Sequence, residues 1–166
     1  MSAMHRQVIY AGRRWQLEKN KKELEDKYRF STEKQLLDIE MIHDFLSTKA
    51  YWSLKIPKET VIRSIEHSLC FGVYKNNEQV GFARVISDYS TIAYLGDVFI
   101  LESHRGKGLS KLLMSAIMNH DKLQGLRRWI LLTGDAHGLY KKFGWKELAD
   151  PTIWLELRNS NVYQKK

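Results

Sequence analysis

The period of the apolar residues changes several times along the chain, and each change predicts a new structural element. Residues 94–101 form a mostly apolar run with β-branched and aromatic members, which is typical of a buried strand. From Leu109 the apolar residues return every three or four positions, which predicts a helix that lies on a sheet. That apolar stripe consists of Leu109, Leu112, Leu113, Ala116 and Ile117. The pattern therefore predicts a strand, a short loop and a helix between residues 94 and 118.

The rest of the chain predicts further strands and helices around this unit. Asn76-Asn77 separates two apolar runs, and asparagine tolerates the left-handed backbone of a tight turn. Residues 128–133 are almost continuously apolar, as in a strand buried on both faces. In chain order we predict a short strand at 28–30, helices at 32–47 and 57–69, strands at 70–74, 79–87 and 91–101, the helix from 109, and strands at 128–133 and 153–157.

The order of these elements predicts the fold class. Three successive strands joined by short turns indicate an antiparallel meander. The strand that follows the helix is expected to run parallel to the strand before it. We therefore expect an α/β (α+β) fold, with a mixed, twisted central sheet and helices on both faces. We assign residues 27–166 to this single domain and residues 1–26 to an N-terminal extension, which is either a surface helix or a poorly ordered segment.

The loop before the predicted helix combines glycine with positive charge. The first backbone N–H groups of a helix have no helical partner and carry the positive end of the helix dipole. Gly106 and Gly108 would let an anion approach them closely, and Arg105 and Lys107 add charge. These features predict a cradle for phosphate or pyrophosphate. On these residues alone, a tight turn with solvated basic side chains remains an alternative.

Composition limits the cellular compartment and the classes of partner that we expect for this protein. The chain has 166 residues and one cysteine, Cys70, so no internal disulfide is expected and a cytoplasmic location is predicted. No apolar run approaches membrane-spanning length, and the N-terminus lacks the apolar core of a signal peptide, so we expect no membrane partner. The net charge is +8, but the basic residues are not interleaved with aromatics, so we do not expect nucleic acid. No metal-ligand spacing is visible, and no metal is expected.

Arg105-Gly106-Lys107-Gly108-Leu109-Ser110 resembles the Arg/Gln-x-x-Gly-x-Gly/Ala signature of the GNAT N-acetyltransferases. Ser110 takes the final Gly/Ala position, and the resemblance extends from about Tyr28 to Leu157. It implies that the loop holds the pyrophosphate of acetyl-CoA, and that the pantetheine arm pairs with a strand backbone in a gap between two splayed strands. Thr133 stands where many members carry a cofactor-contacting asparagine. The implied cofactor-binding residues are Val98, Phe99, Ile100, Arg105, Gly106, Lys107, Gly108, Leu109, Ser110 and Thr133.

The segment from Ala136 to Trp145 is similar to the Ala-x-x-x-Tyr-x-x-x-Gly-Phe pattern of the same family. The resemblance implies that Tyr140 is the general acid that protonates the departing thiolate, a role that suits a phenol protonated at neutral pH. The alternative for Tyr140 is a packing role beside the sheet. Asp97 is the candidate base, acting directly or through a water. Its alternative role is a structural carboxylate bonded to a neighbouring strand or loop.

The resemblance implies an acetyl-CoA-dependent N-acetyltransferase that moves an acetyl group to a primary amine by direct attack in a ternary complex. The rival interpretation is a regulatory module that binds CoA or another nucleotide without turnover. The acceptor is expected to be a small-molecule or peptide amine, and the sequence does not identify it. Tyr51 and Trp52 lie between two predicted helices, where they either line the acceptor pocket or cover the core edge. A homodimer is left open.

Overall fold

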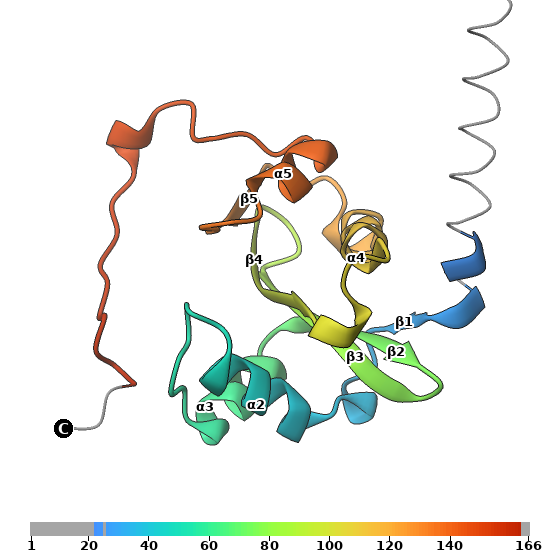
Figure 1. Cartoon of the computed structure of the whole chain (residues 1–166). Helices are drawn as coiled ribbons and strands as arrows, with labels where there is room; N and C mark the ends of the chain where they lie inside the picture. The colour runs from blue at the N-terminus through green and yellow to red at the C-terminus, as the bar shows by residue number, and fades with distance from the viewer. Residues whose placement is uncertain (1–21, 25, 164–166) are drawn as a thin grey trace, which may run out of the picture.

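The computed structural model describes residues 22–24 and 26–163 (Figure 1). Most of the predicted N-terminal extension therefore lies outside the described residues. Its described end, residues 22–24 and 26–27, is helical, and Leu24 packs against the core. The domain boundary between residues 26 and 27 stays a prediction.

The centre of the molecule is a mixed sheet, as predicted, with five strands where the sequence predicted six. The strands lie in sequence order, and the first four pair antiparallel while the last pair is parallel. They are β1 (Arg29–Ser31), β2 (Leu69–Lys75), β3 (Glu78–Ser87), β4 (Ile92–Ile100) and β5 (Arg128–Leu131). Asn76 and Asn77 form the turn between β2 and β3 with positive φ angles of 50° and 68°, so the predicted turn chemistry is confirmed.

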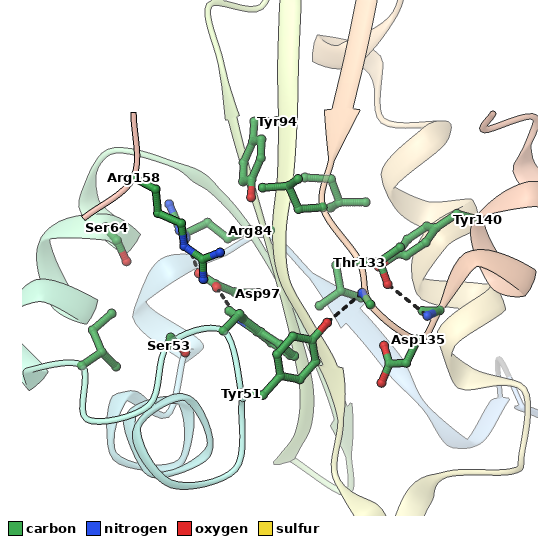
Figure 2. A pocket seen from close by; sticks show the side chains of 18 of the residues that line it. Tyr51, Ser53, Ser64, Arg84, Tyr94, Asp97, Thr133, Asp135, Tyr140 and Arg158 are labelled. Carbon is green, nitrogen blue, oxygen red and sulfur yellow. Dashed lines mark hydrogen bonds and ion pairs between the residues drawn. The ribbon is translucent and has the colours of Figure 1, made fainter. Parts of the chain in front are cut away.

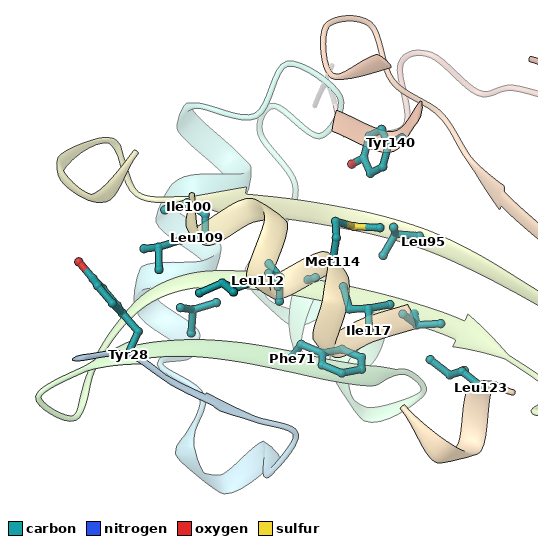
Figure 3. Close-up of a cluster of buried hydrophobic side chains, with 14 of the residues drawn as sticks. Tyr28, Phe71, Leu95, Ile100, Leu109, Leu112, Met114, Ile117, Leu123 and Tyr140 are labelled. Atoms are coloured by element: carbon teal, nitrogen blue, oxygen red, sulfur yellow. The ribbon is translucent and has the colours of Figure 1, made fainter. Parts of the chain in front are cut away.

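Helices cover both faces of the sheet. The helices α2 (Ile39–Thr48) and α3 (Lys58–Glu66) bury a cluster that includes Phe82 and Phe99, whereas α4 (Leu109–Met118) lies over a separate cluster (Figures 1 and 3). A short helix, α5 (His137–Tyr140), follows β5. The predicted stripe of α4 is buried except for Ala116, and Met114 is buried in addition. The mixed architecture with helices on both faces is confirmed.

The start of the first predicted helix was wrong. Residues 34–36 form a short 3₁₀ turn, and α2 begins only after Asp38. The carboxylate of Asp38 accepts a hydrogen bond from the backbone N–H of Met41 at 3.0 Å, which makes Asp38 the N-cap of the helix.

The predicted last strand, 153–157, does not form. Residues Pro151–Ile153 make a 3₁₀ turn, and the chain then runs away from the sheet as an extended arm (Figure 1). Leu155 and Leu157 are 98% and 103% exposed, whereas Glu156 and Arg158 line a cavity. The alternation is that of an extended chain, but a strand also needs a neighbouring strand to accept and donate its backbone hydrogen bonds.

Across the described ranges 22–24 and 26–163, no helix is both long and apolar enough to cross a lipid bilayer.

Candidate functional site

A cavity of about 600 Å³ opens where β4 and β5 stop pairing (Figure 2). The parallel pairing ends at Leu95 and Leu131, whereas β4 continues to Ile100. The last part of β4 therefore has no strand beside it on the β5 side. The walls of the cavity come from the loop between α2 and α3, from β4, from the loop after β5 and from the C-terminal arm.

A β-bulge bends β4 at the cavity wall. The register between β3 and β4 shifts between Phe82 and Arg84, and Asp97 has a positive φ of 54°. Positive φ is uncommon outside glycine, although aspartate adopts it more readily than most residues. The bulge sets the direction of the strand segment that the pantetheine arm is predicted to use.

The three β4 residues predicted to bind cofactor are not equivalent. Val98 lines the cavity and is half-buried. Phe99 stacks on Phe45 with ring centroids 3.8 Å apart, and Ile100 belongs to the cluster under α4. The side chains of Phe99 and Ile100 therefore serve the core, which leaves only their backbone atoms for a ligand.

Asp97 lies in the cavity wall with both carboxylate oxygens engaged. The Nε of Arg84 donates to Oδ2 at 2.7 Å, and the indole Nε1 of Trp52 donates to Oδ1 at 3.1 Å. The Arg84 and Asp97 side chains are only 16% and 12% exposed. This is the arrangement of the structural alternative, so the role of Asp97 as a base stays a prediction. Arg84 was missed, although a charged residue inside an apolar strand was a visible signal.

Tyr140 is buried at the end of α5, and its side chain lines the same cavity. Burial, and to a smaller extent the negative charge of Asp135, raise the pKa of Tyr140 to about 12. The phenol is therefore protonated at neutral pH, as an acid requires. Thr133 also lines the cavity, and its Oγ1 accepts a hydrogen bond from the backbone N–H of Ala136 at 3.0 Å.

The predicted phosphate cradle lies at the start of α4, away from the cavity lining. Gly106 and Gly108 have φ angles of 75° and 90°, and Gly108 is the N-cap. A Cβ added to Gly106 would meet nothing within 4 Å, so the space in front of the loop is open. Leu109 is buried in the core and Ser110 is half-buried in the first turn of α4. Positive φ is the backbone conformation that glycine adopts without strain, which explains both glycines.

The basic residues of the cradle shape the loop itself. The Nε of Arg105 donates to the carbonyl oxygen of Ile100 at 3.0 Å, and the Nζ of Lys107 donates to that of Ser103 at 2.9 Å. The loop is also braced from the N-terminal side, because the hydroxyl of Tyr28 lies 3.0 Å from Nδ1 of His104. A hollow of about 230 Å³, bordered by Glu23, Leu24, Lys27 and Lys107, adjoins the cradle.

The structure therefore brings Tyr140, Asp97, Val98 and Thr133 around one cavity and leaves residues 105–110 at the head of α4. Sequence reasoning missed Tyr94, Glu156 and Arg158, which also line the cavity. Glu156 lies within the predicted strand 153–157 and Arg158 directly follows it, so this segment was interpreted as a strand instead of one wall of a site. Among the residues whose placement is described, no group of three or more His, Cys, Asp or Glu side chains could hold a metal ion.

Comparison with known proteins identifies what this arrangement resembles. The family model described as "Acetyltransferase (GNAT) family" matches residues 39–145. A Gibberella zeae protein, named as a candidate acetyltransferase, is 32% identical over 146 residues, which cover 74% of this chain and 81% of that protein.

Solved structures agree with this match. The crystal structure of a candidate GNAT acetyltransferase from Xanthomonas campestris pv. campestris is 51% identical, with a TM-score of 0.81, and the match covers 83% of this chain and 97% of that one. A Clostridium acetobutylicum acetyltransferase crystallised with acetyl-CoA is 16% identical, with a TM-score of 0.53, and the match covers 79% of this chain and 94% of that one. The second likeness shows the fold alone.

Proposed function

Because the chain belongs to the GNAT family of acetyltransferases, we propose that it transfers the acetyl group of acetyl-CoA to a primary amine by direct attack in a ternary complex. The observation that carries this proposal is the cavity where β4 and β5 separate, with Tyr140 on one side and the open end of β4 on the other. A thioester placed there has a protonated phenol within the same cavity.

The cradle supports acetyl-CoA as the acetyl donor. The φ of 90° at Gly108 and the open space at Gly106 leave the N–H groups at the start of α4 accessible to a pyrophosphate. The Clostridium acetobutylicum structure, which shares the fold, contains acetyl-CoA. The proposed contacts are the backbone of residues 105–110 with the pyrophosphate and the backbone of 98–100 with the pantetheine arm, while Thr133 borders the arm from the loop after β5.

The proposed chemistry assigns one task to each part of the cavity. Backbone N–H groups between Val98 and Ile100 stabilise the negative charge that develops on the carbonyl oxygen. The amine nitrogen bonds to the carbonyl carbon and loses a proton to Asp97 or to a water that Asp97 holds. The carbon–sulfur bond then breaks, and Tyr140 gives its phenolic proton to the departing thiolate. No bond to the protein forms in this sequence.

The rest of the proposal concerns acceptor and location. Candidate acceptors are small-molecule and peptide amines, for which Tyr51, Trp52 and the C-terminal arm provide lining beside the proposed thioester position. We place the protein in the cytoplasm, where its single cysteine, Cys70, stays reduced. Cys70 is buried, and burial raises the pKa of its thiol to about 11, which leaves it an unreactive core residue.

The test is release of free CoA thiol when the protein is mixed with acetyl-CoA and a panel of amines. The panel contains amino acids, polyamines, aminoglycosides, peptides with free N-termini and lysine-rich proteins. Mass spectrometry of the reacted acceptor identifies the acetylated nitrogen. We expect thiol release that depends on both an acceptor and the protein, and one acetyl group added to an amine.

The rival class is a module that binds CoA or another nucleotide and does not turn over. It shares the cradle at residues 105–110, and it differs in needing neither Tyr140 nor a base. Tight CoA binding by calorimetry, together with no thiol release across the whole panel, would support that class and reject the enzyme.

A further inference from the structure

Two consecutive residues bridge the opening between β4 and β5. The hydroxyl oxygen of Tyr51 accepts a hydrogen bond from the backbone N–H of Gly134 at 2.8 Å, although the two residues are 83 positions apart in the chain. The next residue, Trp52, donates to Asp97 on β4. Tyr51 is thus tied to the segment after β5, and Trp52 is tied to the bulge of β4. Figure 2 shows Tyr51 reaching across the cavity from the loop between α2 and α3.

Hydrophobic burial does not explain this bridge. Tyr51 and Trp52 are 57% and 42% exposed, and their rings meet edge to face with centroids 5.0 Å apart. Burial of the remaining ring area stabilises this contact but selects no direction. The two directed hydrogen bonds set where the two side chains point.

Gly134 leaves room for the Tyr51 hydroxyl because it has no side chain. A Cβ built on Gly134 would lie 3.0 Å from the hydroxyl oxygen of Tyr51, which is tighter than an ordinary contact. Gly134 is not among the glycines with positive φ, so its backbone does not require glycine. A side chain at this position would therefore displace the Tyr51 hydroxyl by a few tenths of an ångström.

The bond to Gly134 bears on the acid of the proposed reaction. Gly134 belongs to the turn in which Thr133 accepts from the N–H of Ala136, and the carbonyl of Ala136 accepts from the N–H of Tyr140 at 3.3 Å. This turn places α5, and α5 carries Tyr140. The hydrogen bond at Gly134 therefore restrains the turn before α5, the helix that carries Tyr140.

We propose that Tyr51 is a positioning residue: its hydrogen bond to Gly134 holds the Tyr140 segment at a set distance from β4 while Trp52 anchors the same loop on Asp97. This inference rests on the proposed acetyl transfer, in which Tyr140 is the acid. We call the two hydrogen bonds, from Gly134 to Tyr51 and from Trp52 to Asp97, the clamp. The clamp keeps the two sides of the cavity at the separation that the reacting thioester needs. Without it, Tyr140 is still present but is less well placed.

The kinetic test uses Tyr51→Phe, which removes the bonding oxygen and keeps the ring. We expect kcat to fall about tenfold to a hundredfold, because small misplacement of a catalytic group is costly, while CoA affinity stays unchanged. Gly134→Ala, which displaces the Tyr51 hydroxyl without removing it, should lower kcat in the same direction by a smaller factor. Tyr89→Phe is the matched control, since Tyr89 is a similarly exposed tyrosine outside the cavity lining, and its kcat should not change.

A double-mutant cycle separates positioning from an independent structural role. If Tyr51 acts through Tyr140, then Tyr51→Phe should cost little further rate in a Tyr140→Phe background. The proposal would be overturned if the two fold-losses in kcat multiply in the double variant. It would also be overturned if Tyr51→Phe has the same kcat as Tyr89→Phe.

The clamp itself is measurable without turnover. The Gly134 amide proton should exchange with solvent about tenfold faster in Tyr51→Phe than in the unmodified protein, as followed by NMR. Equal exchange rates would show that the bond does not persist in solution and would reject the clamp, whatever the acceptor screen finds. Faster exchange in a protein that turns over no amine would keep the clamp and reject the proposed function, which distinguishes the two failures.

Discussion

The guanidinium of Arg84 and the carboxylate of Asp97 form an ion pair across the bulge of β4, with Nε and Oδ2 2.7 Å apart. Arg84 is on β3 and Asp97 on β4, so the pair spans the point where the two strands lose register. The pair fastens the bulge that gives the open end of β4 its direction.

Asp97→Asn should therefore destabilise the fold. Asparagine tolerates the same positive φ, so the backbone is preserved, but Arg84 loses its counter-charge in a largely buried place. We expect the free energy of unfolding in urea to fall by about 1–3 kcal/mol. Asp44→Asn is the control, because its pair with Lys49 is exposed and is expected to contribute less than about 1 kcal/mol.

The same pair separates the two roles considered for Asp97. Arg84→Gln breaks the pair and leaves the carboxylate in place. If Asp97 is the base, Asp97→Asn should lower turnover by ~10²–10⁴-fold and Arg84→Gln by much less. Equal losses in the two variants would leave Asp97 with a structural role only.

Gly108→Val should abolish CoA binding. Valine is strained at a φ of 90°, and its side chain would enter the space where an anion meets the first amides of α4. The strain alone should cost about 1–2 kcal/mol of stability. Gly125→Val is the matched control, because Gly125 also has a positive φ, 72°, with nothing within 4 Å of its Cβ position. CoA affinity is measured by calorimetry. Equal affinity in the two variants would contradict the assignment of residues 105–110 as the pyrophosphate cradle.

Tyr140→Phe should lower kcat by ~10²–10⁴-fold while CoA affinity changes little. The substitution removes one oxygen and keeps the ring that meets Trp145 with centroids 6.0 Å apart. Turnover is measured with the acceptor found in the screen, over a range of pH. A variant with the same rate and the same pH profile as the unmodified protein would make Tyr140 a packing residue.

Tyr140 should also make stability depend on alkaline pH. Its pKa is raised from 10.0 to about 12 by burial, so the folded state holds the proton more tightly than the unfolded state does. The stabilisation is complete below pH 10 and is lost as pH rises from 10 to about 12. Denaturant titrations in this window should show a shallower decline for Tyr140→Phe. Parallel declines would contradict the raised pKa.

Replacing Leu155 and Leu157 by serine should cost almost no stability. Both side chains are essentially fully exposed, so no buried apolar area is lost. Leu113→Ala, on the buried face of α4, should cost about 2–5 kcal/mol in the same thermal or urea experiment. A large loss in the leucine double variant would mean that the arm packs in solution. Sedimentation velocity would then show whether a second copy covers it, which bears on the homodimer left open by the sequence.

The sequence by itself determined the features that depend on neighbours a few residues away. The stripe of α4, the turn at Asn76-Asn77 and the positive φ of Gly106 and Gly108 follow from side-chain periodicity and from which residues tolerate left-handed backbone. The order of β2 to β5 followed as well, since short turns leave antiparallel pairing and a helical crossover leaves parallel pairing. The pattern thus predicted the mixed sheet, whereas the gap between the two splayed strands was expected only from the resemblance to the GNAT family.

Only the tertiary structure decided which groups meet across that cavity. Arg84 and Asp97 are 13 positions apart, and Tyr51 and Gly134 are 83 apart, so no local period connects them. The same limit explains the arm at residues 153–157: its extended backbone is local, but it becomes a strand only where the packing of the whole chain brings it beside the edge of another strand. A hydrogen bond between distant segments depends on how the whole chain packs, and that information is spread over every residue of the fold.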